Sequence, residues 1–467
     1  MPAIRTDSTG EIDPFFNPRS VALVGASADT KKLGNSILMN LMNSGIKVYP
    51  VARSASRIMG LDTYSSLAEL PEAVDMVLVA IDAKHCPGLI PEIRKAGAHC
   101  AVIISGGFSE TGAEGAKLED SLLKAARDAG VRLIGPNCVG VSNSRLFNGT
   151  FTLMPERGNI SFITQSGALG GASIYTTHAK RIGLSKFVSV GNAVDVGITE
   201  ILVYLKEDPE TAVIAVYVEG IKNGRRFYES LQETTRSKPV VVLKGGRSEE
   251  GNKAVKSHTG SLAVSIGVFD GMLRQAGCVT APTLDTLFEL SKFFDYQPLP
   301  QGRNICIITN TGGAGVLAAD AASVLNLRMS VLRDSTRHEM RQVLSPLASV
   351  GNPIDLVATG GKREYRIATE QALRDPDVDM LLVICVVPTF ANMTQTEHAE
   401  GMIEGMRDSG VQKPVVGVWL AGNVGRPGKD LLESGRVPCY DDPALAALCL
   451  ARAAEYADYR RRVEDSH

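Results

Sequence analysis

Two segments of the chain have the same form, GNISFITQSGALGG (residues 158–171) and RNICIITNTGGAGV (residues 303–316). Each is an apolar run followed by threonine, an amide side chain, a hydroxyl residue and glycine, and then by the small residues of a helix start. A short apolar run that ends in such a turn is typical of a buried strand that leads into a helix. Because Ile160 and Ile305 match at an offset of 145 residues, the chain contains an internal repeat.

Two further pairs of segments extend the repeat. GNAVDV (residues 191–196) matches GNPIDL (residues 351–356), and EDPETAVIAVYV later matches RDPDVDMLLVIC. The offset grows along the chain, which indicates insertions in the loops of the second copy. We therefore predict two related flavodoxin-like α/β domains, residues 151–297 and 298–467, joined by the proline-containing segment YQPLPQG.

The residues ahead of the repeat predict a third domain. Apolar runs and helical stretches alternate along them, which is typical of an α/β domain with a parallel sheet. The expected strands lie in SVALVGAS (20–27), which runs into a glycine-containing turn, and in IKVYPV (46–51), DMVLVAI (75–81), CAVIISG (100–106) and VRLIG (131–135). We assign residues 1–150 to a Rossmann-like domain, so the predicted fold class is α/β throughout.

Composition excludes several classes of function. With 44% apolar residues, 21% charged residues and a net charge of -2, the chain has no electrostatic reason to bind nucleic acid or an anionic membrane. No apolar run is long enough to span a bilayer, and the N-terminus resembles no signal peptide. The eight cysteines are scattered and the seven histidines form no metal-ligating cluster, so we expect a cytoplasmic protein without a metal site.

The first predicted strand ends in a phosphate-binding type of turn. Gly25 and Ser27 stand before a helix start that contains Lys32, and backbone N–H groups at such a turn bind phosphate. An NAD-binding domain needs an acidic residue after its second strand, whereas this chain has Arg53 and a second arginine there. The basic residues favour a ligand with several phosphates, such as coenzyme A. A purely structural turn is the alternative.

The two repeated turns suggest a second anion site. They present Ser166 and Gly167 in the first copy, and Thr311, Gly312 and Gly313 in the second, where a strand meets a helix. Free backbone donors at helix N-termini suit a tetrahedral anion. Duplicated domains often pack about a pseudo-twofold axis, so we hypothesise one phosphoryl site between two helix ends. Alternatively, the glycines only permit close packing of helix against strand.

A nucleophile for phosphorus is also present. His258 lies in the polar stretch KSHTGS, and neutral imidazole attacks phosphorus readily. Glu219 follows the apolar strand AVIAVYV and would be able to accept the imidazole N–H and fix its tautomer. From spacing alone, both residues also fit ordinary solvated loop positions.

These motifs together resemble the α subunit of ADP-forming acyl-CoA synthetases (acetate–CoA ligases), relatives of succinyl-CoA synthetase. The resemblance covers residues 12–460. Its motifs are VALVGAS, ISGGFSETG, LIGPNCVG, SFITQSGALG, GNAVDV, VYVEG, KSHTGSLA, ITNTGGAGVLAAD and NPIDL. Two departures are Ala52-Arg53, where the family often has Asn-Pro, and Val264, where it commonly has glycine; they put the detailed CoA contacts and the freedom of the KSHTGSLA loop in doubt.

The resemblance implies roles for individual residues. His258 would be the phosphorylated histidine, Glu219 its support, and the two repeated turns would hold the phosphate. Asn137 would lie near the acyl pocket. The residues that would line the CoA site are Gly25, Ser27, Lys32, Ser105, Gly106, Gly107 and Phe108.

The resemblance also implies the reaction acid + CoA + NTP ⇌ acyl-CoA + NDP + phosphate, through an acyl phosphate and a phosphohistidine. The family needs an ATP-grasp module to bind ATP or GTP with Mg²⁺, and the three predicted domains leave no segment of suitable length for it. We therefore expect a separate ATP-grasp β subunit in a hetero-oligomer, a heterotetramer by analogy with the family. The alternatives are a non-catalytic CoA-binding regulatory module and, less favoured, an NAD-dependent oxidoreductase.

Overall fold

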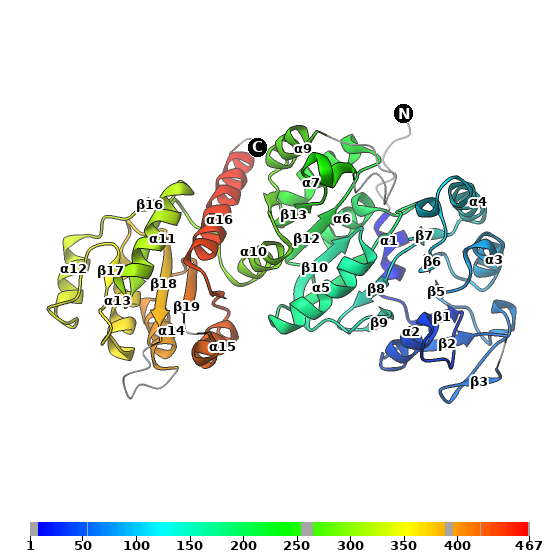
Figure 1. The fold of residues 1–467 in the computed structure, drawn as a ribbon, viewed down its shortest axis with the longest axis horizontal. Coiled ribbons are helices and arrows are strands. Elements are labelled where there is room, and N and C mark those ends of the chain that lie inside the picture. The colour runs from blue at the N-terminus through cyan, green and yellow to red at the C-terminus, as the bar shows by residue number, and fades with distance from the viewer. Residues whose placement is uncertain (1–7, 54, 254–264, 388–395, 421, 466–467) are drawn as a thin grey trace. The chain divides into compact units, whose positions relative to one another are not determined.

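The computed structural model describes residues 8–53, 55–253, 265–387, 396–420 and 422–465. The chain divides into two compact units, residues 1–291 and 292–467 (Figure 1). Unit 1 contains two large sheets and unit 2 contains one. Each unit is built from strands that alternate with helices, as the sequence predicts.

The first sheet of unit 1 has the strand order β2-β1-β5-β6-β7, and its pairs are parallel. Its strands are β1 (Ser20–Val24), β2 (Lys47–Val51), β5 (Met76–Val79), β6 (Cys100–Ile103) and β7 (Arg132–Ile134). The elements around them are α1 (Ser8–Ile12), α2 (Leu33–Met42), the hairpin β3 (Arg57–Ile58) and β4 (Leu61–Asp62), α3 (Cys86–Lys95) and α4 (Ala113–Ala129). The strand order reverses between β1 and β5, and open parallel sheets bind ligands beside such a point, outside the carboxyl ends of the strands.

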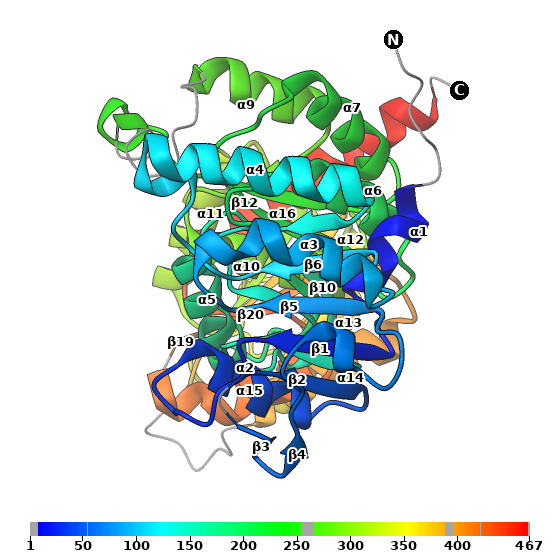
Figure 2. The same ribbon diagram turned by 90° about the vertical axis from the view of Figure 1, so that its right-hand side faces the viewer.

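Apolar side chains bury both faces of this sheet. Helices α3 and α4 lie together on one face (Figure 2), where Ile90, Ile93 and Leu122 pack on Ala22 and Val79. The residues of α2 join a different core cluster, which continues into the second sheet. The first sheet is therefore held against the second sheet by a shared apolar core.

The second sheet has the order β14-β13-β12-β10-β11-β8-β9. Its strands are β8 (Gly140–Asn143), β9 (Phe147–Thr150), β10 (Arg157–Thr164), β11 (Leu184–Ser189), β12 (Val213–Val218), β13 (Val240–Lys244) and β14 (Val279–Thr280). Its helices are α5 (Gly167–Ala179), α6 (Ile198–Glu207), α7 (Gly224–Thr235), α9 (Ile266–Gln275) and α10 (Leu284–Tyr296). The antiparallel hairpin β8–β9 pairs with β11, which attaches the end of the predicted first domain to the sheet of the second.

Unit 2 has the strand order β16-β15-β18-β19-β20, with β17 beside the carboxyl end of β15. Its strands are β15 (Asn304–Thr309), β16 (Arg328–Met329), β17 (Ile354–Asp355), β18 (Met380–Val386), β19 (Val415–Leu420) and β20 (Cys439–Tyr440). Its helices are α11 (Gly312–Val324), α12 (Asp334–Arg341), α13 (Lys362–Arg374), α14 (Glu397–Ser409), α15 (Arg426–Ser434) and α16 (Pro443–Glu464). All of these strand pairs are parallel.

The predicted repeat is confirmed by topology. The order β14-β13-β12-β10-β11 in unit 1 corresponds strand for strand to β20-β19-β18-β15-β16 in unit 2. Helix α5 follows β10 in the same way that α11 follows β15. The predicted α/β fold class, a Rossmann-like sheet followed by two flavodoxin-like sheets, is confirmed.

Within the described ranges, no helix has both the length and the apolar character that a membrane span requires. The same part of the chain contains no group of three or more histidine, cysteine or acidic side chains arranged to hold a metal ion.

Candidate functional site

The predicted CoA residues of the first turn lie at the carboxyl ends of β1 and β2. Gly25 has φ +96°, and a Cβ there would lie 2.3 Å from the carbonyl oxygen of Ala80, so only glycine fits. The amide of Asn35 donates to the carbonyl oxygen of Ser27 at 2.9 Å, which fixes the turn to α2. Lys32, the N-cap of α2, and Arg53, just after β2, are exposed. The two cations are therefore available to an anionic ligand beside the turn.

The second group of predicted CoA residues, Ser105–Phe108, follows β6. The hydroxyl of Ser105 donates to the carbonyl oxygen of Ile81, and the backbone N–H of Gly107 donates to Glu110 Oε1 at 2.6 Å. Phe108 N–H donates to the same oxygen at 3.1 Å. Burial opposes ionisation of Glu110, but these N–H groups and the Asn192 amide outweigh it and hold the pKa of its carboxyl below the usual value. Glu110 thus shapes this loop and uses two of its backbone donors.

Asn137 lies directly beside that loop. Its backbone N–H donates to the carbonyl oxygen of Ser105 at 2.9 Å. A Cβ on Gly106 would lie 3.3 Å from Asn137 Oδ1, so the two segments are in close contact. The structure therefore brings Asn137 together with Ser105 and Gly106, while a place for it beside an acyl group stays a prediction.

Asn192 is a residue whose role the sequence did not reveal. It stands in GNAVDV, after β11, and its side-chain amide donates to Glu110 Oε2 at 2.7 Å and to Glu119 Oε2 at 2.8 Å. Its carbonyl oxygen accepts from Lys222 Nζ at 3.2 Å. Gly191 makes this approach possible, because a Cβ there would lie 2.2 Å from the carbonyl oxygen of Pro136. Asn192 thus connects the Ser105–Phe108 loop to the loop that follows Glu219.

Glu219 follows β12, at the carboxyl edge of the second sheet, and is 8% exposed. The amide of Gln165 holds this strand end: it accepts from the N–H groups of Glu219 and Gly220 and donates to the carbonyl oxygen of Gly220 at 2.8 Å. Among the described residues, Glu219 Oε2 has no hydrogen-bond partner although it is buried. Burial of a carboxylate oxygen without a hydrogen bond is unfavourable, so Oε2 is available to accept a hydrogen bond from a further group.

The two predicted phosphate turns have matching geometry. Thr164 Oγ1 accepts from Ser166 N–H at 3.1 Å, and Thr309 Oγ1 accepts from Thr311 N–H at the same distance. Neither Ser166 nor Thr311 uses its hydroxyl to cap α5 or α11, and the first turns of these two described helices hold no acidic residue. Gly312 and Gly313 are exposed. Each helix N-terminus, taken by itself, is therefore open to an anion.

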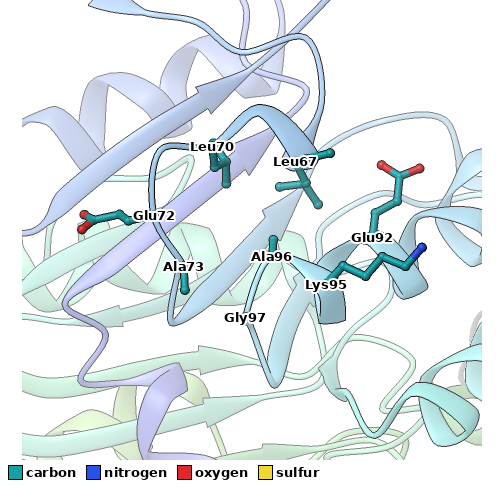
Figure 3. Close-up of a pocket in the computed structure, with 9 residues that line it drawn as sticks. Leu67, Leu70, Glu72, Ala73, Glu92, Lys95, Ala96 and Gly97 are labelled. Atoms are coloured by element: carbon teal, nitrogen blue, oxygen red, sulfur yellow. The ribbon is translucent and has the colours of Figure 1, made fainter.

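One predicted site residue cannot be placed, and the pocket shown in Figure 3 contains none of the others. His258 lies outside the described residues, so its position relative to Glu219 stays a prediction. The pocket in Figure 3 encloses about 530 Å³ and lies at the opposite edge of the first sheet, beside the amino ends of β5 and β6. It is lined by Leu67, Ala68, Leu70, Glu72, Ala73, Glu92, Lys95, Ala96 and Gly97. None of the predicted site residues lines this pocket.

Comparison with protein-family models divides the chain into three matches. Residues 19–144 match a CoA binding domain. Residues 157–294 match a succinyl-CoA ligase like flavodoxin domain, and residues 305–449 match a Ligase-CoA domain. The match over residues 19–144 contains the predicted CoA residues, and the match over residues 157–294 contains Ser166 and Glu219.

Known proteins resemble the chain along nearly its whole length. It is 42% identical over 449 residues to the α subunit of ADP-forming acetate–CoA ligase II of Pyrococcus furiosus, covering 95% of this chain and 98% of the relative. The α subunit of ligase I from the same organism is 36% identical, with coverages of 97% and 99%. A solved structure of the dinucleotide forming acetyl-coenzyme A synthetase 1 of Ca. Korarchaeum cryptofilum, in complex with phosphate and ADP, matches with a TM-score of 0.92 and 34% identity, covering 97% and 98% of the two chains.

Proposed function

This chain belongs to the family of ADP-forming acetate–CoA ligase α subunits, and we propose that it supplies the CoA-binding and phosphohistidine-carrying half of an NDP-forming acyl-CoA synthetase. It is accordingly a subunit of an acid–thiol ligase. The relatives are ligases, so they do not favour the alternative of a non-catalytic regulatory module. The overall reaction is acid + CoA + NTP ⇌ acyl-CoA + NDP + phosphate.

In the thioester-consuming direction, the proposed reaction has three steps. Phosphate attacks the acyl carbon of acyl-CoA, the carbon–sulfur bond breaks, and the thiol leaves with a proton as an acyl phosphate forms. A ring nitrogen of His258 then attacks the phosphorus, the bond to the acyl oxygen breaks, and the carboxylate leaves. The phosphohistidine finally transfers its phosphoryl group to the terminal oxygen of NDP, which gives NTP and restores His258.

The observation that carries this proposal is the buried Oε2 of Glu219, which has no hydrogen-bond partner in the part of the chain that the structure describes. A carboxylate oxygen in that state would accept an imidazole N–H and so present the other ring nitrogen to phosphorus. Gln165 fixes the strand end that bears Glu219 and stands next to Ser166 in the phosphate turn. The N-terminus of α5 would stabilise the negative charge of the phosphoryl group.

The other predicted residues divide between two tasks. Gly25, Ser27, Lys32 and Arg53, with Ser105, Gly106, Gly107 and Phe108, would bind CoA and its phosphates, and Asn137 would lie beside the acyl group. The residues that would bind the transferred phosphate are Ser166, Gly167, Thr311, Gly312 and Gly313. ATP or GTP with Mg²⁺ would be bound by an ATP-grasp β subunit in a hetero-oligomer, as the name of the α-subunit relatives suggests.

The experiment is phosphorylation of the chain in the thioester-consuming direction. The protein is incubated with radiolabelled phosphate and a panel of acyl-CoA thioesters, alone and with the ATP-grasp subunit, beside His258→Ala. We expect an acid-labile, base-stable label on the wild type and none on the variant, and the accepted thioesters identify the carboxylic acid. Equal labelling of His258→Ala, or absence of label while CoA binds in the presence of both subunits, overturns the proposal.

A further inference from the structure

The side-chain amide of Asn192 lies at the centre of a polar cluster beside the Ser105–Phe108 loop. Its Nδ2 donates to Ser109 Oγ at 3.1 Å, to Glu110 Oε2 at 2.7 Å and to Glu119 Oε2 at 2.8 Å. The hydroxyl of Ser109 donates to the same oxygen of Glu119 at 2.7 Å. Ionised carboxylates only accept hydrogen bonds. Two carboxylates therefore share one uncharged donor group.

Glu110 is the member of this cluster that reaches the loop. Its Oε1 accepts from the N–H of Gly107 at 2.6 Å and from that of Phe108 at 3.1 Å, while its Oε2 accepts from Asn192. A Cβ on Gly106 would lie 3.2 Å from Glu110 Oε1, so the carboxylate also packs closely against the loop. One oxygen of Glu110 thus holds the loop, and the other is held by Asn192.

The backbone fixes the segment that carries Asn192, residues 191–196, independently of this amide. Three of its N–H groups donate to carbonyl oxygens in or just after β7: Asn192 to Pro136 at 3.0 Å, Val194 to Gly135 at 3.1 Å and Val196 to Leu133 at 3.0 Å. These bonds join the second sheet to the first. Removal of the Asn192 side chain should therefore leave the segment in place and change only what the amide holds.

The second copy of the repeat uses the matching asparagine in another way. Asn352 of GNPIDL binds its own sheet: its Nδ2 donates to the carbonyl oxygens of Ile305 at 2.8 Å and Ser330 at 3.1 Å, and its Oδ1 accepts from Ile307 N–H at 3.0 Å. The amide of Asn192 instead donates to side chains that follow β6 in the first sheet. The contact with the loop therefore belongs to the first copy and is no general requirement of the repeated fold.

We infer that Asn192 is a positioning residue for coenzyme A binding: through Glu110 it holds the Ser105–Phe108 loop in the conformation that receives the ligand. The inference rests on the proposed function, which assigns this loop to the CoA site. A loop that is already fixed loses less conformational entropy when its ligand binds, so a fixed loop gives higher affinity. The amide thus contributes to affinity by ordering the loop.

The test measures binding of coenzyme A to the full chain by isothermal titration calorimetry. Asn192→Ala should raise the dissociation constant by about tenfold, the lower range for loss of a hydrogen bond to a charged group. Glu110→Ala should weaken binding to a similar extent. In the Glu110→Ala background, Asn192→Ala should add a change of less than about threefold, because Asn192 acts through that carboxylate.

Asn192→Asp gives a readout that a loss of stability would not produce. This variant keeps the shape but places a third carboxylate beside Glu110 and Glu119, so the cluster repels itself near neutral pH. Like charges raise the pKa of a carboxyl, and a protonated carboxyl donates the missing hydrogen bond. Relative to wild type at the same pH, the dissociation constant of Asn192→Asp should therefore fall between about pH 8 and about pH 5.5. Lys222 also faces this segment, but its Nζ donates to the backbone carbonyl of residue 192 at 3.2 Å.

Asp195→Asn is the matched control. Asp195 stands in the same segment, and its carboxylate accepts from Arg132 Nε at 2.8 Å and from Leu133 N–H at 2.9 Å, so the variant weakens a contact between the same two sheets away from the loop. We expect its dissociation constant for coenzyme A to stay within about twofold of wild type, because independent sites do not couple.

Three results would overturn the inference: wild-type affinity in Asn192→Ala, an equal loss of affinity in Asp195→Asn, or a defect of Asn192→Asp that does not change with pH. The proposed function fails in a different way. If the wild type binds no coenzyme A, either alone or with the ATP-grasp subunit, the assignment of the CoA site is itself wrong.

Discussion

The two copies of the repeat use the same backbone for different purposes. In both, a threonine at the strand end holds the helix-starting turn, and an amide side chain ties that turn to the neighbouring strand. Only the first copy places a carboxylate, Glu219, at the end of that neighbouring strand, where the second has Val386. The turn between strand and helix is therefore common to both copies, whereas the carboxylate on which the proposed chemistry depends stands at one strand end.

The largest effect on the phosphorylation rate is expected at Glu219, where the second copy of the repeat has the apolar residue Val386. Glu219→Gln removes the charge but keeps the shape, so the phosphorylation rate should fall by about 10²- to 10⁴-fold, as for other histidines that lose their orienting acid. Val386→Gln places the same side chain at the matching position of unit 2, where Val386 is 37% exposed, and should leave the rate unchanged. Rapid-quench measurement of labelled protein gives the phosphorylation rate of each variant. A similar loss in both variants would mean that the two strand ends contribute equally.

The next difference concerns a buried aspartate that both copies retain. In unit 1, Asp208 accepts from Lys186 Nζ at 2.7 Å, and Lys186 is only 1% exposed. In unit 2, the matching Asp375 accepts instead from the N–H groups of Arg333 and Asp377 at 2.9 and 3.0 Å. Only the arrangement in unit 1 pairs the aspartate with a buried cation. Lys186→Met should therefore leave the buried carboxylate of Asp208 without its cation and lower the free energy of unfolding by about 3–5 kcal/mol.

This cost can be assigned to unit 1 by experiment. The single tryptophan, Trp419, is 2% exposed in unit 2, so its fluorescence reports the unfolding of that unit. Hydrogen exchange of the β10–β12 peptides should show the loss of protection in Lys186→Met, while the Trp419 transition stays in place. Lys186→Met/Asp208→Asn, which removes both charges, should recover much of the stability. Equal protection of Lys186→Met and wild type would show that the ion pair contributes little.

The sequence predicted the features that depend on local pattern. The strands, the two turns and the repeat all follow from apolar runs that end in glycine-containing turns, and the residues of the first turn lie together because neighbouring parallel strands end at one edge. Asn192 was missed because its partners Ser109 and Glu119 lie 83 and 73 residues away in the chain. Only tertiary packing brings such residues together.

The smallest expected effect concerns how tightly each helix packs on its strand. A Cβ on Gly170 of α5 would lie 2.5 Å from Thr164 Cγ2, whereas one on Gly315 of α11 would lie 3.1 Å from Thr309 Cγ2. The first contact requires Thr164 to move and the second needs only a small adjustment. Gly170→Ala should therefore lower the free energy of unfolding by about 1–3 kcal/mol, as is typical of overpacking. In Gly315→Ala the strain should be offset by the higher helix propensity of alanine, about 0.8–1.0 kcal/mol.

The two alanine variants also differ in their expected effect on phosphorylation. Thr164 Oγ1 forms hydrogen bonds with the backbone N–H and carbonyl of Ser166. Displacement of Thr164 in Gly170→Ala should therefore disturb the predicted phosphate turn. We expect slower labelling and lower protection of β10 and α5 against hydrogen exchange. Gly315→Ala should leave both the Trp419 transition and the labelling rate near wild type. If the two variants behave alike, the closer packing of α5 on β10 has no consequence, and the copies differ only in the side chains at their strand ends.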